Sequence, residues 1–167
     1  MENTDDILKK INSNNPELLA EAVKDIKENG DLNIAETLLS TLSTFCESHT
    51  QNTIINLLAD IKDNNFRPLL IKKIQSASDS SLKSALLRIV WESALDYSPY
   101  LEVLIHILRN DEFAAAFEAS TAIENMVCNL TAQQRHTLRQ MMEQFPPEKE
   151  FLIENIRKEM GCCEEEE

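Results

Sequence analysis

The chain has 167 residues, of which 43% are apolar, and it contains only 2 glycines and 5 prolines. A chain of this length and apolar content can bury one substantial core, and the scarcity of glycine and proline favours helix over sheet. The formal charge is −13, which disfavours nucleic-acid binding because such binding relies on Lys and Arg displacing counterions from phosphates. We therefore predict a single all-α domain. The negative charge of the chain either serves solubility alone or attracts a basic protein or peptide.

The first residues indicate where the protein resides. Met1 to Asp6 contain neither the basic nor the apolar region of a signal peptide, and no apolar run approaches the roughly 18 residues that a membrane span needs. We expect a cytoplasmic protein without membrane contact. The cysteines follow neither a metal-finger nor a secreted-framework spacing, so we expect free thiols at Cys46, Cys128, Cys162 and Cys163.

The N-terminal third is expected to form four helices. A short one lies near Asp5 to Ile11, and the next opens at Asn15-Pro16-Glu17 and ends at Asn29-Gly30-Asp31. Proline in the first turn and glycine past the last turn is the usual asymmetry of a helix. Apolar residues at spacings of three and four predict two more helices, from Ala35 to Phe45 and from Ile54 to Ile61.

Two matched segments follow, residues 66–91 and 98–123, and each has the pattern helix, short acidic turn, helix. Their turn aspartates, Asp79 and Asp111, are 32 positions apart, and we expect each to cap the following helix. A fixed period in the range of about 20 to 50 residues is typical of a solenoid, in which each helix pair packs only against its neighbours. The apolar residues expected in the core from the helix after Asp111 are Phe113, Ala116, Phe117 and Ile123.

The segment Leu82 to Ala94 is apolar on two sides. One side carries Leu82, Leu86 and Ile89, and the other carries Leu87, Trp91 and Ala94. Such a helix needs neighbours on both flanks. At roughly 1.5 to 3 kcal/mol for each large buried side chain, it is expected to be the centre of stability.

A last pair of helices is predicted after Thr131, which is placed to cap a helix that runs to Phe145. Pro146-Pro147 ends that helix, and a closing helix bears Leu152 and Met160. Together with the short N-terminal helix, this pattern predicts ten helices in five hairpins.

The turn Asp79-Ser-Ser-Leu82-Lys83 resembles the Asp-x-x-Val-Arg/Lys turn of HEAT repeats. Pro68 and Pro99, which are 31 positions apart, lie in first helices, where that family often has proline. As a pattern the resemblance covers roughly Asn15 to Ile123. The second copy departs from it, with Ala114-Ala115 after Asp111 where a Lys or Arg of the family's inter-repeat ladder is expected.

This HEAT-like, armadillo-type resemblance implies a right-handed α-α superhelix, a solenoid of about five helical hairpins. We predict that one such domain spans residues 1–161 and that residues 162–167 form an acidic tail. The resemblance also implies a non-catalytic role as a protein-binding scaffold or adaptor.

No motif in the sequence indicates a reaction. Loops that cradle phosphates need runs of glycine, and the only glycines are Gly30 and Gly161. His106 could act as a base beside a carboxylate one turn away, or it is simply an exposed histidine of a helix surface. Cys162-Cys163 could bind a soft metal, but neighbouring glutamates disfavour the thiolate. We predict no catalytic residue, no metal and no cofactor.

The remaining candidate is a surface. In helical solenoids the second helices of successive pairs line the concave face, and their non-core positions here hold one basic residue among five carboxylates. Such a groove suits a segment that bears Lys or Arg, while the alternative is a solvated face with no ligand. The predicted partner-binding residues are Glu17, Glu21, Asn56, Asp60, Arg88, Glu92, Glu118 and Thr121.

Two other functions stay open at this point. One is a structural subunit that assembles with its own copies through apolar residues of an end repeat, such as Met141, Met142 and Phe145. The other is a DNA glycosylase for alkylated bases, because some HEAT-like proteins of similar size have that activity. Those enzymes need a basic, aromatic-lined groove, which this acidic chain with 1 Trp does not offer.

Overall fold

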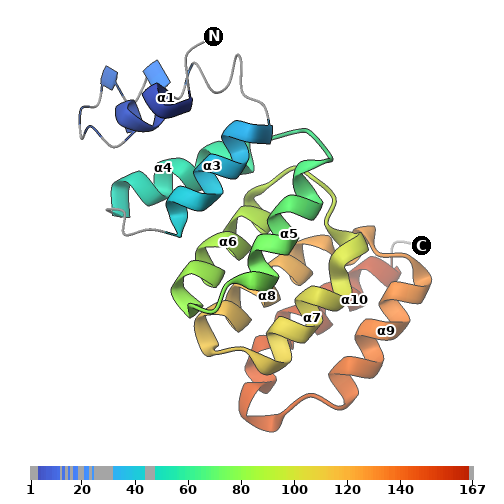
Figure 1. The fold of residues 1–167 in the computed structure, drawn as a ribbon. Helices are drawn as coiled ribbons and strands as arrows, with labels where there is room; N and C mark the ends of the chain where they lie inside the picture. Colours follow the sequence, from blue (N-terminus) through green and yellow to red (C-terminus); the bar gives the residue numbers. More distant parts are fainter. Residues whose placement is uncertain are drawn as a thin grey trace.

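The computed structural model describes residues 4–11, 13, 15, 17–18, 21–22, 24, 32–43 and 48–165. Over these ranges the protein is helical and contains no strand, which confirms the predicted all-α class (Figure 1). No helix in the described part has the length and apolar character needed to cross a membrane. Of the predicted second helix, Pro16 and the end at Asn29-Gly30-Asp31 lie outside the described residues, as does Cys46.

The helices carry the labels of Figure 1. The described α-helices are α1 (Thr4–Ile11), α3 (Leu32–Leu42), α4 (Ser48–Ala59), α5 (Phe66–Ser76), α6 (Ser80–Glu92), α7 (Leu101–Asn110), α8 (Phe113–Met126), α9 (Ala132–Glu143) and α10 (Glu154–Glu165). Three short 3-10 helices accompany them, η1 (Ser98–Tyr100), η2 (Val127–Asn129) and η3 (Pro147–Leu152). Leu152 therefore lies in η3 and precedes the closing helix.

From α3 onward the helices alternate between two layers. In one layer α6 packs against α4 on one side and α8 on the other, and α10 packs against α8. In the other layer α3 contacts α5, and α7 contacts α9. The contacts of α3 with α4, α5 with α6, and α7 with α8 join the layers, so each of these three pairs forms a hairpin (Figure 1).

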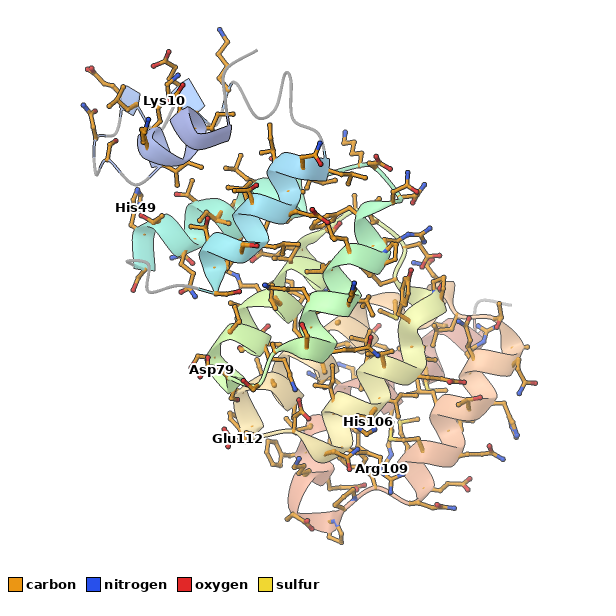
Figure 2. The ribbon with its side chains drawn as sticks, viewed as in Figure 1. Lys10, His49, Asp79, His106, Arg109 and Glu112 are labelled. Atoms are coloured by element: carbon orange, nitrogen blue, oxygen red, sulfur yellow. A yellow bond between two sulfur atoms is a disulfide. The ribbon has the colours of Figure 1, made fainter. Side chains whose placement is uncertain are left out.

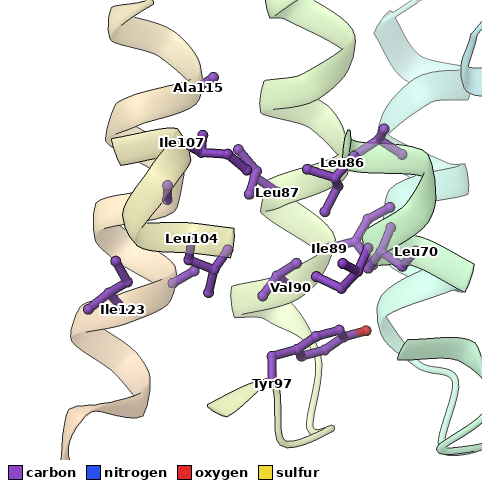
Figure 3. Close-up of a cluster of buried hydrophobic side chains, with 14 of the residues drawn as sticks. Leu70, Leu86, Leu87, Ile89, Val90, Tyr97, Leu104, Ile107, Ala115 and Ile123 are labelled. Atoms are coloured by element: carbon purple, nitrogen blue, oxygen red, sulfur yellow. The ribbon is translucent and has the colours of Figure 1, made fainter. Parts of the chain in front are cut away.

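The predicted double-sided burial of α6 is confirmed. Leu86, Leu87 and Ile89 are fully buried. Figure 3 shows Leu86 and Ile89 pointing toward Leu70 of α5, whereas Leu87 points toward Ile107 of α7. The helix ends at Glu92, so Ala94, expected on its second side, lies beyond it and is exposed.

The turns before α6 and α8 differ in their capping. Asp79 accepts a hydrogen bond from the backbone N–H of Leu82 at 2.7 Å and caps α6 as predicted. The corresponding prediction for Asp111 is wrong, because α8 begins one residue later and its N-cap is Glu112, whose side chain makes no cap hydrogen bond. The Asp111 carboxylate instead accepts a 2.5 Å ion pair from Lys83 of α6.

The start of α9 agrees with the sequence. The Thr131 hydroxyl accepts a hydrogen bond from the backbone N–H of Gln134 at 3.3 Å, and the Gln134 side chain accepts one from the backbone N–H of Thr131 at 2.9 Å. This reciprocal pair is a capping box, which satisfies two donors that a helix start would otherwise leave unpaired.

Two predictions about apolar side chains are wrong. Phe113 and Phe117 are 61% and 51% exposed. The buried stripe of α8 consists mainly of small residues, Ala115, Ala116, Ala119 and Ala122, which allow α6 and α7 to approach closely. The residues considered for self-assembly, Met141, Met142 and Phe145, are buried in the core and offer no surface to a second copy.

The cysteine prediction also needs correction. Cys128, at η2, and Cys163, in α10, form a disulfide with their Cα atoms 5.6 Å apart, whereas Cys162 is free and exposed. The packing of α10 on η2 brings together two cysteines that are 35 positions apart, which their spacing could not reveal.

The predicted boundary after residue 161 falls inside α10, which continues to Glu165.

Candidate functional site

Most of the predicted partner-binding residues lie on the layer of α4, α6 and α8. Asn56 is on α4 and Asp60 follows it, and both are exposed. Glu17 and Glu21 are exposed too, but Glu21 pairs with Lys10 of α1 at 3.2 Å. The hydrogen bonds described below link Arg88, Glu92 and Glu118 to neighbouring side chains, and neither Glu17 nor Glu21 takes part in them.

A polar cluster bridges α4 and α6. Arg88 donates from Nε to Glu92 at 2.5 Å, one turn further along α6. The same guanidinium donates from Nη1 to the side-chain oxygen of Asn52 on α4 at 2.9 Å. Asn52 was missed by the sequence reasoning, although Asn52 and Asn56 lie at i, i+4 spacing on the solvent side of α4, and Asp60 continues this spacing just after the helix.

A second contact bridges α6 and α8. The indole N–H of Trp91 donates to the Glu118 carboxylate at 2.6 Å, and both side chains are half-buried. An ionised carboxylate has about four acceptor sites, so this bond fixes Glu118 and leaves it able to accept further donors. Thr121, also predicted here, donates its hydroxyl to the Phe117 carbonyl at 3.2 Å and so uses its donor within α8.

The face made by these helices is acidic and already ordered. Its one cation in the predicted set, Arg88, is engaged with Glu92 and Asn52. Ion pairs near the surface contribute little to stability, about 0 to 1 kcal/mol. We define Asn52, Arg88, Trp91, Glu92 and Glu118 as the acidic seam, a strip that runs across three helices and presents carboxylate oxygens to a cationic group.

A cleft of about 410 Å³ on the other layer, between α5, α7 and the start of α6, collects several ionisable groups. Lys83 and Asp111 lie in it but pair with each other. His106 also lines it and contacts the Asn110 side chain one turn away at 3.2 Å. The cleft therefore does not place a nucleophile against a base. Figure 2 shows His106 and Arg109 on α7, with Asp79 and Glu112 at the turns that precede α6 and α8.

In the described part of the chain, no group of three or more His, Cys, Asp or Glu side chains lies together in a way that could hold a metal ion. Comparison with models of protein families, with curated proteins and with solved structures finds no match to this chain. The resemblance to HEAT repeats therefore stays a prediction based on the turn at Asp79 and its spacing.

Proposed function

We propose that the protein is a non-catalytic adaptor that binds a basic segment of a partner protein along the acidic face of α4, α6 and α8. The observation that carries this proposal is the acidic seam, whose side-chain hydrogen bonds join polar groups of α4 to α6 and of α6 to α8. A surface whose side chains are already held in place loses less conformational entropy on binding, which favours recognition by that surface.

The proposal includes the predicted architecture, a right-handed solenoid of HEAT-like hairpins. It is supported by the alternation of helices between two layers and by the Lys83–Asp111 ion pair. Lys83 lies in the first turn of α6, and Asp111 lies in the connection between α7 and α8, so the pair joins successive hairpins in the manner of a ladder.

The test uses random 12-residue peptides displayed on phage and selected on the full-length protein at low salt. We expect selected peptides to be rich in Lys and Arg and to bind more weakly as salt is raised, because exposed charges are screened over about 10 Å at 0.1 M salt. In Glu92→Gln with Glu118→Gln, the affinity for a selected peptide should fall about three- to tenfold. Glutamine at position 118 can still accept the Trp91 hydrogen bond.

A matched control changes the same charge on the other layer. Glu102 of α7 and Glu143 of α9 are exposed, so Glu102→Gln with Glu143→Gln removes two carboxylates without touching the acidic seam. The control should bind the selected peptide as the wild type does. Equal losses in both double variants would show that net charge alone attracts the peptide, and the proposed face would be wrong.

A further inference from the structure

Three phenylalanines form an exposed cluster beside the acidic face. Phe113 and Phe117 lie on the first turns of α8, and Phe151 lies in η3. Their exposed fractions are 61%, 51% and 54%, and the ring centroid of Phe113 is 6.0 Å from that of each of the other two. We call these three residues the phenylalanine patch. A contiguous exposed apolar patch is often a site of interaction.

The patch is held in place by contacts beneath it. The Ser120 hydroxyl of α8 is buried and donates to the Leu152 carbonyl of η3. Lys149 of η3 donates its ammonium to the carbonyls of Arg109 and Asp111, at 3.1 Å and 2.7 Å, where α7 ends. These bonds tie η3 to α8 and to the turn before it, so the three rings share one surface before any partner arrives.

The surroundings of the patch are acidic. Each of its phenylalanines has a glutamate as its direct neighbour in the chain, in the pairs Glu112-Phe113, Phe117-Glu118 and Glu150-Phe151. Two basic side chains of this region are held by partners within the protein. Lys149 is bound to backbone carbonyls, and Arg157 pairs with Glu150 and donates to the Met142 carbonyl at 3.1 Å. A partner would therefore meet apolar rings flanked in the chain by Glu112, Glu118 and Glu150.

Size and charge together select the occupant. The rings expose on the order of 300 Å², well below the roughly 800 Å² that each partner contributes to a standard interface. This is the size of an anchoring point for a short segment and not of a stable dimer interface. A second copy would also bring the same three glutamates and a net charge of −13 against the first. Like charges brought together oppose association, so the occupant carries positive charge.

We propose that the phenylalanine patch anchors an amphipathic peptide segment of a partner protein, with aromatic or large aliphatic side chains on the rings and Lys or Arg against the surrounding glutamates. This inference rests on the proposed adaptor function and extends its binding face from α8 to η3. Glu118 connects the two regions, because it accepts the Trp91 hydrogen bond and directly follows Phe117.

The experiment uses the same phage-displayed peptides on the full-length protein, with Phe113→Ser combined with Phe151→Ser. We expect peptides that combine Phe, Trp, Leu or Ile with Lys or Arg, and we expect their affinity to fall at least tenfold in this double variant. The matched control is Leu18→Ser, which removes an apolar side chain that is 36% exposed at the N-terminal end of the chain, and it should change affinity less than twofold.

Both substituted rings are more than half exposed, so the double variant should keep the wild-type circular dichroism spectrum and melting temperature. If it melts early, Phe151→Ser alone replaces it, because the backbone bonds of η3 through Lys149 and Leu152 do not depend on that ring.

The outcomes separate this inference from the adaptor function on which it rests. Peptides that bind the patch variant normally, but lose affinity for Glu92→Gln with Glu118→Gln, would overturn the patch and leave the adaptor standing. A wild-type dimer in sedimentation that becomes monomeric in the patch variant would assign the patch to self-association and overturn the inference. Failure to select any peptide would overturn both proposals.

Discussion

The phenol of Tyr97 is buried in the connection between α6 and η1, with 2% of the residue exposed. Its hydroxyl has no hydrogen-bond partner of ordinary geometry within the described part of the chain. Burial raises the pKa of this phenol well above its usual range, and the nearby Ser93 and Arg67 oppose that shift only weakly. The native protein therefore keeps Tyr97 neutral in solutions where the unfolded chain ionises it.

This difference predicts a loss of stability in alkali. Below about pH 10 both states hold the phenolic proton, and above it the unfolded chain releases a proton that the native state retains, so the free energy of unfolding falls. Tyr97→Phe should abolish that part of the fall. It should also raise the free energy of unfolding at pH 7 by up to about 1 kcal/mol, because it removes a buried hydroxyl without a partner.

Urea unfolding at pH 7 and at about pH 10.5 measures both effects. Tyr100→Phe serves as the control, because Tyr100 is half-buried and its ring lies 6.4 Å from that of Tyr97. If wild type and Tyr97→Phe lose equal stability between the two pH values, the alkaline loss originates elsewhere.

At the scale of single elements, the two turn aspartates provide a sharp contrast. Asp79 acts through a local hydrogen bond that any short acceptor can make, whereas Asp111 acts through its charge on Lys83. Asp79→Ala should cost about 1 kcal/mol, and Asp79→Asn should cost almost nothing, because Asn caps as well as Asp. Asp111→Asn should cost nearly as much as Asp111→Ala, since both remove the negative charge that pairs with Lys83.

Urea unfolding of the four variants tests this assignment, and the loss at Asp111 should also shrink in high salt. A large cost for Asp79→Asn would show that the charge of Asp79, and not its cap hydrogen bond, stabilises α6.

These elements also show what the sequence can and cannot predict. Asp79 was predicted correctly because a cap bonds a residue three positions away, so its evidence is local in the chain. Asp111 was assigned the wrong role because its partner is 28 positions away. Phe113 and Phe117 have the spacing of a buried stripe, but spacing alone does not say which stripe of α8 its neighbours cover. In the structure, the neighbouring helices cover the alanine stripe of α8, and these small side chains let α6 and α8 pack closely.

In the candidate site, too, features within one helix were predicted and contacts between helices were not. Arg88, Glu92 and Glu118 were predicted from polar positions along single helices, and the structure places them on one layer. The hydrogen bond from Arg88 to Asn52 spans 36 positions, and the one from Trp91 to Glu118 spans 27. Both therefore depend on the packing of α6 between α4 and α8. Phe151 could not be grouped with Phe113 from the sequence, because η3 reaches α8 only through the fold.

At the scale of the whole molecule, the Cys128–Cys163 disulfide ties the C-terminal helix to the rest. It closes a stretch with a sequence separation of 35, for which chain entropy predicts a stabilisation of about 4 kcal/mol. We expect Cys128→Ser to lower the free energy of unfolding by about 2 to 4 kcal/mol. Cys162→Ser, at the neighbouring free thiol, should leave it unchanged.

Urea unfolding with and without dithiothreitol checks this prediction, and the reduced wild type should match Cys128→Ser. Oxidised and reduced wild type of equal stability would contradict it. The state of these thiols in the source cell would also test the expected cytoplasmic location, because disulfides persist mainly in oxidising compartments.

The central position of α6 determines how slowly its backbone amides exchange with solvent. Outer helices can open locally while the rest stays folded, but α6 is covered by α4, α5 and α8 at once. Its backbone amides reach solvent only when the whole stack comes apart. The slowest deuterium uptake in the chain should therefore occur in α6, and its rate reports the stability of the entire molecule without any denaturant.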